Sequence, residues 1–172
     1  MLNVLEKTAD ILGWIASTMA RLMLIFIAAI LFLQVVLRYV FLFSLPWPEE
    51  AARYLMIWVV MLAGSLLIKD DQLVTVDFFD KLWPRRLLVA RNVLFRVLLA
   101  GLLGVLFWQG IDLATFSANR TTVALQISWF WPYLAIPVGA GLMLFHMLVL
   151  ALRDLLRGPP EHHEPTVLRA EI

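Results

Sequence analysis

The stretch LMLIFIAAILFLQVVL, residues 22–37, decides the fold class of this chain. Gln34 is its one polar residue, and the apolar run extends back to about Ile11 with Arg21 as its one charge. The long side chain of Arg21 can reach toward lipid headgroups. Because a helix needs about 20 apolar residues to cross a bilayer, residues 11–37 are predicted to form a membrane-spanning helix.

The whole chain is too apolar for an ordinary soluble domain. Of its 172 residues, 62% are hydrophobic, against about 45–50% in soluble globular domains. It has no cysteine, which excludes disulfides, thiolate catalysis and cysteine-ligated metals. The formal net charge is +1, so no excess of charge points to a nucleic-acid partner.

Three more apolar runs predict spans at about residues 51–68, 87–111 and 129–152. Pro46 and Pro48 precede the second span, where a helix can begin. Pro137 lies inside the fourth and is expected to kink it unless a neighbour satisfies the freed carbonyl. Residues 1–157 are therefore predicted to form one all-α integral membrane domain with four transmembrane helices.

The first helix is expected to be long and to remain in the mature protein. From Val4 to Leu37 a helix would measure about 50 Å at 1.5 Å per residue. That exceeds a hydrocarbon core of about 30 Å, so the helix must tilt or lay its first turns in the interface. Glu6, Lys7 and Asp10 interrupt the N-terminus, unlike the apolar core of a cleaved signal peptide.

The distribution of lysine and arginine predicts that both termini are cytoplasmic. The two tails and the loop between the second and third spans share nine basic residues: Lys7, Lys69, Lys81, Arg85, Arg86, Arg91, Arg153, Arg157 and Arg169. The opposite side has three, Arg38, Arg53 and Arg120. Basic residues concentrate in short cytoplasmic loops. The chain is thus expected to be a multi-pass protein in contact with membrane lipids, with the Trp47 and Trp129 regions at the outer interface.

Residues 158–172 form a polar, proline-rich tail that is expected to be mobile in the cytoplasm. It contains the pair His162 and His163, but a metal site needs more ligands than an isolated pair. A solvated tail is therefore favoured, and no metal or cofactor is predicted.

The spans contain few groups for chemistry at the bilayer midplane. Gln34, His146 and the Gly64-Ser65 pair are the polar candidates, and such residues more often bond to a neighbouring helix than to substrate. A satisfied interfacial histidine is favoured for His146, and a single in-span histidine excludes bis-histidine haem. No nucleophile, base and orienting group converge. The chain is therefore predicted not to be an enzyme and to have no catalytic, substrate-binding or metal-binding residue.

Small residues recur at spacings that permit close helix approach, as in Ala100-x-x-x-Gly104 and Ala135-x-x-x-Gly139. Such spacings are frequent in membrane helices. Packing among the four spans explains them at least as well as docking to another protein.

A charged segment separates the first two spans. Arg38 ends the first, while Trp47, Glu49, Glu50 and Arg53 open the second. Arg53 is four residues from Glu49 and three from Glu50, spacings at which side chains meet on one helix face. Ion pairs among these residues are therefore expected at the membrane boundary, with Arg38 as a third member. Spacing alone favours an ordinary interfacial charge cluster.

The order of residues around these charges carries a family resemblance. It runs through Val36-Leu37-Arg38-Tyr39-Val40-Phe41, Trp47-Pro48-Glu49-Glu50-Ala51-Ala52-Arg53-Tyr54, Ile57-Trp58, Ala63-Gly64-Ser65, Val76-Asp77 and Leu82-Trp83-Pro84. In order, spacing and four-span size, the chain resembles the DctQ-type small membrane subunit of TRAP (tripartite ATP-independent periplasmic) transporters. That family often has a histidine four residues before the loop aspartate. Leu73 stands at that position here, so this chain departs from the family pattern there.

The resemblance implies a heteromer in a bacterial inner membrane. A large DctM-type subunit would carry the substrate and sodium sites, and a periplasmic substrate-binding protein would deliver an organic acid. The small subunit would brace the large one. Its structural or interface candidates are Arg38, Trp47, Glu49, Glu50 and Arg53, and the four charged ones are expected to order the outer ends of the first two spans.

Three alternative functions stay open. The small subunit of tripartite tricarboxylate transporters also has four spans, although the Trp-x-Glu-Glu region favours the TRAP type. A non-catalytic anchor subunit of a respiratory complex is disfavoured because in-span histidines are scarce. A small membrane enzyme is disfavoured because no catalytic constellation is present.

Overall fold

The computed structural model describes residues 2–70 and 85–157, and it describes side chains for residues 4–70 and 94–152. Four helices account for most of this part: α1 Leu2–Val40, α2 Trp47–Lys69, α3 Arg85–Phe116 and α4 Phe130–Arg157. Each is long and apolar enough to cross a membrane. The predicted all-α fold with four membrane-spanning helices is therefore confirmed, and the described residues contain no strand beyond an isolated bridge between Thr121 and Ser128.

The helices exceed the predicted spans because polar and interfacial residues continue the helical hydrogen bonding at their ends. α3, for example, runs to Phe116, beyond the predicted limit at residue 111. α4 continues through Pro137, whose ring lies 2.8 Å from where a Cβ on Gly110 would be. The predicted tail at residues 158–172, and Leu73, Asp77 and Trp83 of the loop, lie outside the described residues.

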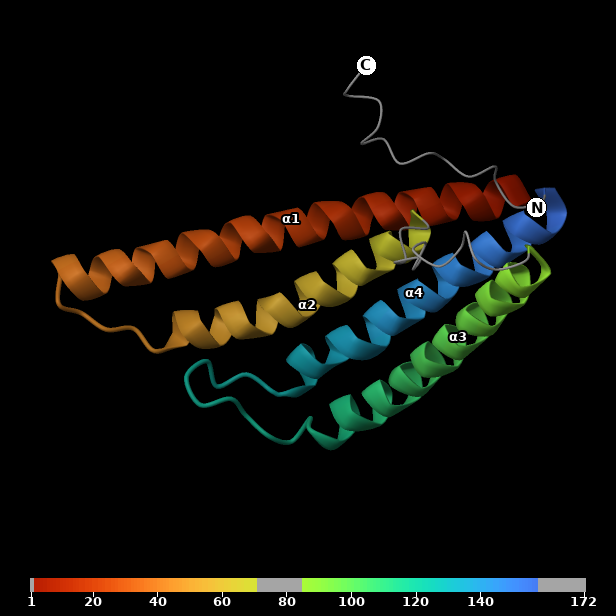
Figure 1. Ribbon diagram of the computed structural model, residues 1–172. Coiled ribbons are helices and arrows are strands. Elements are labelled where there is room, and N and C mark those ends of the chain that lie inside the picture. The colour runs from red at the N-terminus through yellow and green to blue at the C-terminus, as the bar shows by residue number, and fades with distance from the viewer. Residues whose placement is uncertain (1, 71–84, 158–172) are drawn as a thin grey trace, which may run out of the picture.

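The four helices lie in the order α1, α2, α4, α3, as Figure 1 shows. Helix α2 packs between α1 and α4, and α3 packs on the far side of α4. The two inner helices are the most buried, because each has a neighbour on both sides. α1 and α3 each expose a long apolar face, which in this chain is the expected surface for lipid or another membrane protein.

Two polar contacts set the register between α1 and α2. Near one end Gln34 bonds to Glu49 at 2.9 Å, and near the other Asp10 pairs with Lys69 at 2.9 Å. The 24 positions between Asp10 and Gln34 correspond to about 36 Å of helix, close to the thickness of a bilayer. α1 continues past both contacts, so the prediction of an unusually long first helix is confirmed. We call the two ends of the bundle the Glu50 end and the Lys69 end.

Small residues allow the inner helices to approach closely. A Cβ on Gly139 would lie 2.5 Å from the Cβ of Met61, and one on Gly64 would clash with the Cε of Met143. Neither position has room for a larger side chain without movement of its neighbour. Part of the small-residue pattern in the sequence is thus explained by packing within the chain.

Candidate functional site

The most connected polar group at the Glu50 end is the carboxylate of Glu50, in the first turns of α2. It accepts hydrogen bonds from the backbone amides of Val123, Ala124 and Leu125 at 3.2, 2.7 and 2.9 Å. The hydroxyl of Tyr54 donates a fourth bond at 2.6 Å. We call this group of five residues the Glu50 cradle. It ties α2 to the connection between α3 and α4.

Local sequence explains the α2 half of the cradle. Pro46 and Pro48 start the helix, since a fixed φ suits the first turn and no amide is lost there from the helical ladder. Glu50 and Tyr54 are four residues apart and therefore lie on one face. The carboxylate is also close to the positive end of the helix dipole.

The other half is a loop, residues 117–129, that satisfies most of its own backbone. The Thr122 amide donates to the Ile127 carbonyl at 2.8 Å, and the Ile127 amide donates to the Thr122 hydroxyl at 3.1 Å. Gln126 completes the turn with a φ of 55°. This leaves three successive amides at the tip pointing to one side, a concave arrangement that favours an anion. Glu50 supplies that anion from another helix.

Next to the Glu50 cradle, aromatic side chains extend the contact between α2 and the start of α4. The ring of Tyr54 meets Trp129 edge-on, with 5.4 Å between centroids, and Trp129 stacks on Tyr133 at 5.5 Å. The indole nitrogen of Trp58 donates to the Trp131 carbonyl at 3.2 Å. Trp58 lies eight residues beyond Glu50, about 12 Å along α2. The start of α4 therefore lies beside the middle of α2 rather than beside Glu50, and the loop of residues 117–129 covers the remaining length of α2 up to Glu50.

Glu49 has a different partner. Its carboxylate accepts a hydrogen bond from Gln34 at 2.9 Å, and the same Gln34 amide group reaches the Leu45 carbonyl at 3.4 Å. Gln34 is only 8% exposed. The interpretation of Gln34 as a residue that bonds across to a neighbouring helix is confirmed. It joins α1 both to the connecting segment and to α2.

The predicted ion pairs around Arg53 are not formed. In the part of the chain whose side chains are described, Arg38 and Arg53 are exposed and make no ion pair, and Trp47 is half-buried. The prediction was wrong because both acids are engaged elsewhere. Glu50 is occupied by three amides and a hydroxyl, and Glu49 by an amide, whereas an exposed arginine keeps its hydration at little cost.

The Lys69 end has its own polar contacts. Lys69 reaches across Gly13, where a Cβ would lie 2.8 Å from its side chain, to pair with Asp10. His146 of α4 is 1% exposed, and neither ring nitrogen has a hydrogen-bond partner among the described residues. The expectation of a satisfied histidine is not met within that part of the chain.

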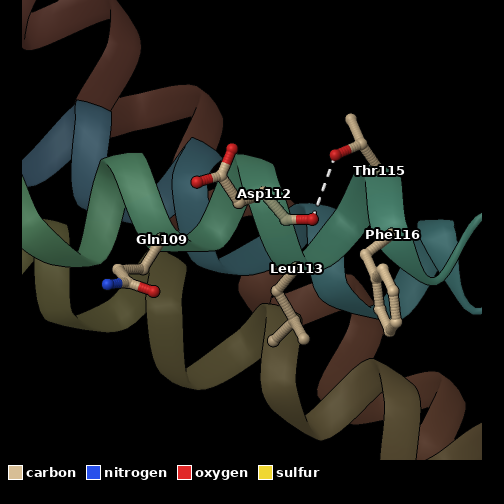
Figure 2. A pocket seen from close by; sticks show the side chains of 5 residues that line it. All are labelled: Gln109, Asp112, Leu113, Thr115 and Phe116. Carbon is tan, nitrogen blue, oxygen red and sulfur yellow. Dashed lines mark hydrogen bonds between the residues drawn. The ribbon is translucent and has the colours of Figure 1, made fainter.

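A shallow groove lies on α3, and Figure 2 shows the residues along it. They are Gln109, Asp112, Leu113, Thr115 and Phe116. The Thr115 hydroxyl bonds to the Asp112 carbonyl at 3.0 Å, within its own helix. The described residues contain no group of three metal-ligating side chains. The groove presents the carboxylate of Asp112, the amide of Gln109 and the hydroxyl of Thr115 beside the apolar side chains of Leu113 and Phe116.

Sequence reasoning found Glu50 but missed most of its cradle. Tyr54 could have been identified from its spacing to Glu50. The three amides have no side-chain signature, and they lie more than 70 positions away. The assembled site joins the first turns of α2 to the loop between α3 and α4.

Comparisons with known proteins identify the family of this chain. The family model for the DctQ component of tripartite ATP-independent periplasmic transporters matches residues 27–157. That range contains α2, α3 and α4 in full, the last part of α1, and the whole Glu50 cradle.

Three curated relatives are similar over much of the chain. The isethionate TRAP transporter permease protein DctMQ of Oleidesulfovibrio alaskensis is 32% identical over 84% of the chain and 25% of its own length. The sialic acid TRAP transporter permease protein SiaT of Haemophilus influenzae is 29% identical over 78% of the chain and 21% of its own length. The small permease protein SiaQ of Vibrio cholerae, from a sialic acid TRAP transporter, is 26% identical over 65% of the chain and 66% of its length.

This chain therefore spans about a quarter or less of the first two relatives. The family match covers well over half of the chain and includes the helices and loop that build the cradle. The protein is a multi-pass membrane protein that belongs to the DctQ family of TRAP transporter components.

Proposed function

We propose that this chain is the small scaffold subunit of a TRAP-type secondary transporter and braces a large membrane subunit. The observation that carries the proposal is the match to relatives more than three times as long as this chain, in which a region similar to it forms about a quarter or a fifth of one permease. We infer that the rest of such a permease is a separate DctM-type subunit here. The family match favours this function over a tricarboxylate-transporter subunit or a respiratory anchor.

The Glu50 cradle supports a bracing role. It links α2 to the loop before α4, and Gln34 links α2 to α1. Three helices are thereby held in register at one end, so that a partner would meet a preorganised surface. Preorganisation lowers the entropy lost on association. In this proposal Glu49 and Glu50 order the Glu50 end of the bundle through their hydrogen bonds. The exposed Arg38 and Arg53 and the half-buried Trp47 lie at the same end.

The proposal includes an orientation and a cargo class. We place the chain in a bacterial inner membrane with both termini in the cytoplasm, on the basis of the lysine and arginine distribution. The Glu50 end then faces the periplasm, where a substrate-binding protein would deliver substrate. The relatives are named for isethionate and sialic acid, so we propose an organic acid as cargo and place the sodium-coupled transport chemistry in the large subunit. We assign no catalysis to this chain.

Co-purification tests the proposal. The tagged full chain is produced together with a DctM-type subunit from the same bacterium, extracted in mild detergent and purified by the tag. We expect a stable complex and sodium-dependent uptake of an organic acid in proteoliposomes that contain both subunits and the binding protein. Recovery of the tagged chain alone, from cells that also make the large subunit in the membrane, would overturn it.

A further inference from the structure

Helix α3 has an outward face on which no other described helix of the chain packs extensively. Only 11% of its most apolar segment is buried, against 22–44% for the other three helices, and it packs extensively only on α4. Its buried positions Leu103, Gly110 and Ala114 form one stripe toward α4. The opposite side lies at the edge of the bundle in Figure 1.

A carboxylate lies at the centre of that outward face. Successive helix residues are about 100° apart, so Asp112, nine positions after Leu103, points about 180° away from it. Asp112 is exposed, and its side chain has no hydrogen-bond or ion-pair partner among the described residues. Phe116 continues the same stripe by four residues, and Arg120 lies over its ring at 5.2 Å rather than pairing with Asp112.

Two glycines on α3 give an independent indication. Seven glycines fall in the described residues, and at five of them a Cβ would meet a neighbouring side chain within 3.3 Å. At Gly101 and Gly104 it would meet no atom of the described residues within 4 Å. A glycine inside a helix costs about 1 kcal/mol relative to alanine, and packing within this chain does not explain that cost here. Small residues on a membrane helix are typical of close contact with another helix.

We propose that the α3 outward face, defined by Leu98, Gly101, Gly104, Val105 and Asp112, is a docking surface for a transmembrane helix of the large subunit. Gly101 and Gly104 would admit its backbone, and Asp112 with Gln109 would pair with a lysine or arginine on it. This inference rests on the proposed function. It adds which helix forms the interface and what chemistry the partner contributes.

The carboxylate of Asp112 favours a protein partner over lipid tails on the outward face of α3. Asp112 lies four residues, about 6 Å, before the end of α3, in the last turns of the segment Leu94–Phe116 that is long and apolar enough to cross a membrane. Charged side chains within membrane spans almost always face a protein interior or a water-filled cavity, and they pair there. In this chain the carboxylate points away from the bundle, so a partner helix that presents a lysine or arginine would supply the protein interior that Asp112 lacks here.

Site-specific photo-crosslinking in the assembled complex tests the location. A benzophenone amino acid replaces Val105, which is 57% exposed on the α3 face, or Phe32, which is 72% exposed on α1 and serves as the matched position. We expect the Val105 probe to form an adduct with the large subunit. An adduct at twice the mass of this chain, or one with lipid alone, would overturn the inference.

Substitutions test the chemistry. Gly101→Leu and Asp112→Asn should leave the melting temperature of the isolated chain unchanged or higher, yet lower the recovered large subunit about tenfold, because each removes an interface feature. Asp112→Glu should retain the large subunit, and Asp70→Asn, at the other end of the bundle, controls for loss of one charge. Unchanged recovery with both Gly101→Leu and Asp112→Asn would overturn the inference.

The two proposals fail in different ways. If the Phe32 probe captures the large subunit and the Val105 probe does not, the scaffold function stands and the α3 interface is wrong. If the unmodified chain and the large subunit do not co-purify, the scaffold function itself is wrong.

Discussion

The amide of Leu125 donates a hydrogen bond of 2.9 Å to the carboxylate of Glu50, although the two residues are 75 positions apart in the chain. Val123 and Ala124 donate to the same carboxylate. The contact makes the first turns of α2 and the loop before α4 one unit. Four predictions follow from this unit and from the packing beneath it, and each can be measured on the isolated chain in detergent.

Glu50→Gln should loosen the loop at residues 122–127. A glutamine has one acceptor oxygen, and its NH2 group would face backbone donors, so at least one amide would lose its partner. We expect amide exchange at Val123, Ala124 and Leu125 to become about tenfold faster, measured by hydrogen–deuterium exchange. Glu49→Gln is the matched control, because its carbonyl can still accept from Gln34. Equal acceleration in both variants would contradict a specific role for Glu50.

Tyr54 should contribute more through its ring than through its hydroxyl. Tyr54→Phe removes one hydrogen bond to Glu50 and should cost about 1 kcal/mol. Tyr54→Ala also removes the edge-on contact with Trp129 and leaves a cavity, so it should cost about 3 kcal/mol or more. Thermal unfolding of the two variants gives the order. A phenylalanine variant as unstable as the alanine variant would contradict this division.

Gln34 should be replaceable by an apolar residue more easily than by an acid. Gln34→Leu removes the bond to Glu49 and should cost about 1 kcal/mol, as is usual for polar contacts between membrane helices. Gln34→Glu places a second carboxylate at the 2.9 Å contact and should be more destabilising because like charges repel. Unfolding in detergent at low salt would show this order, and added salt should narrow the gap between the variants.

The effect of replacing a glycine on the stability of the chain should depend on the free space around that glycine. Gly139→Leu would place atoms where Met61 already lies and should destabilise the chain by about 1–3 kcal/mol through overpacking. Gly101→Ala meets no neighbour and should stabilise α3 by up to about 1 kcal/mol. The melting temperatures of the isolated variants should shift in opposite directions. A loss of stability in Gly101→Ala would show that α3 has a close neighbour within its own chain.

The hydrogen-bond partners within the site were less predictable from the sequence than the four-helix fold. Gln34 was identified as a cross-helix contact because a lone amide in an apolar run has few other options. The pairing of Glu50 with Arg53 was wrong, although their spacing permits it. Spacing along one helix describes only the partners on that helix. The competing donors are backbone amides at the tip of a loop that has no polar side chain there, so no pattern of residue types in the sequence indicates these donors.

The sequence by itself determined that four apolar helices form a membrane protein, because the length and hydropathy of each run depend only on its own residues. The order of residues around Arg38 and Trp47 also indicated the family to which the chain belongs. Only the tertiary structure decided which groups bond to Glu49 and Glu50, and at which glycines a neighbouring side chain leaves no room for a Cβ atom. It also decided that Asp112 points away from the bundle. These depend on the register and rotation of helices against each other, which arise from packing between segments distant in the chain.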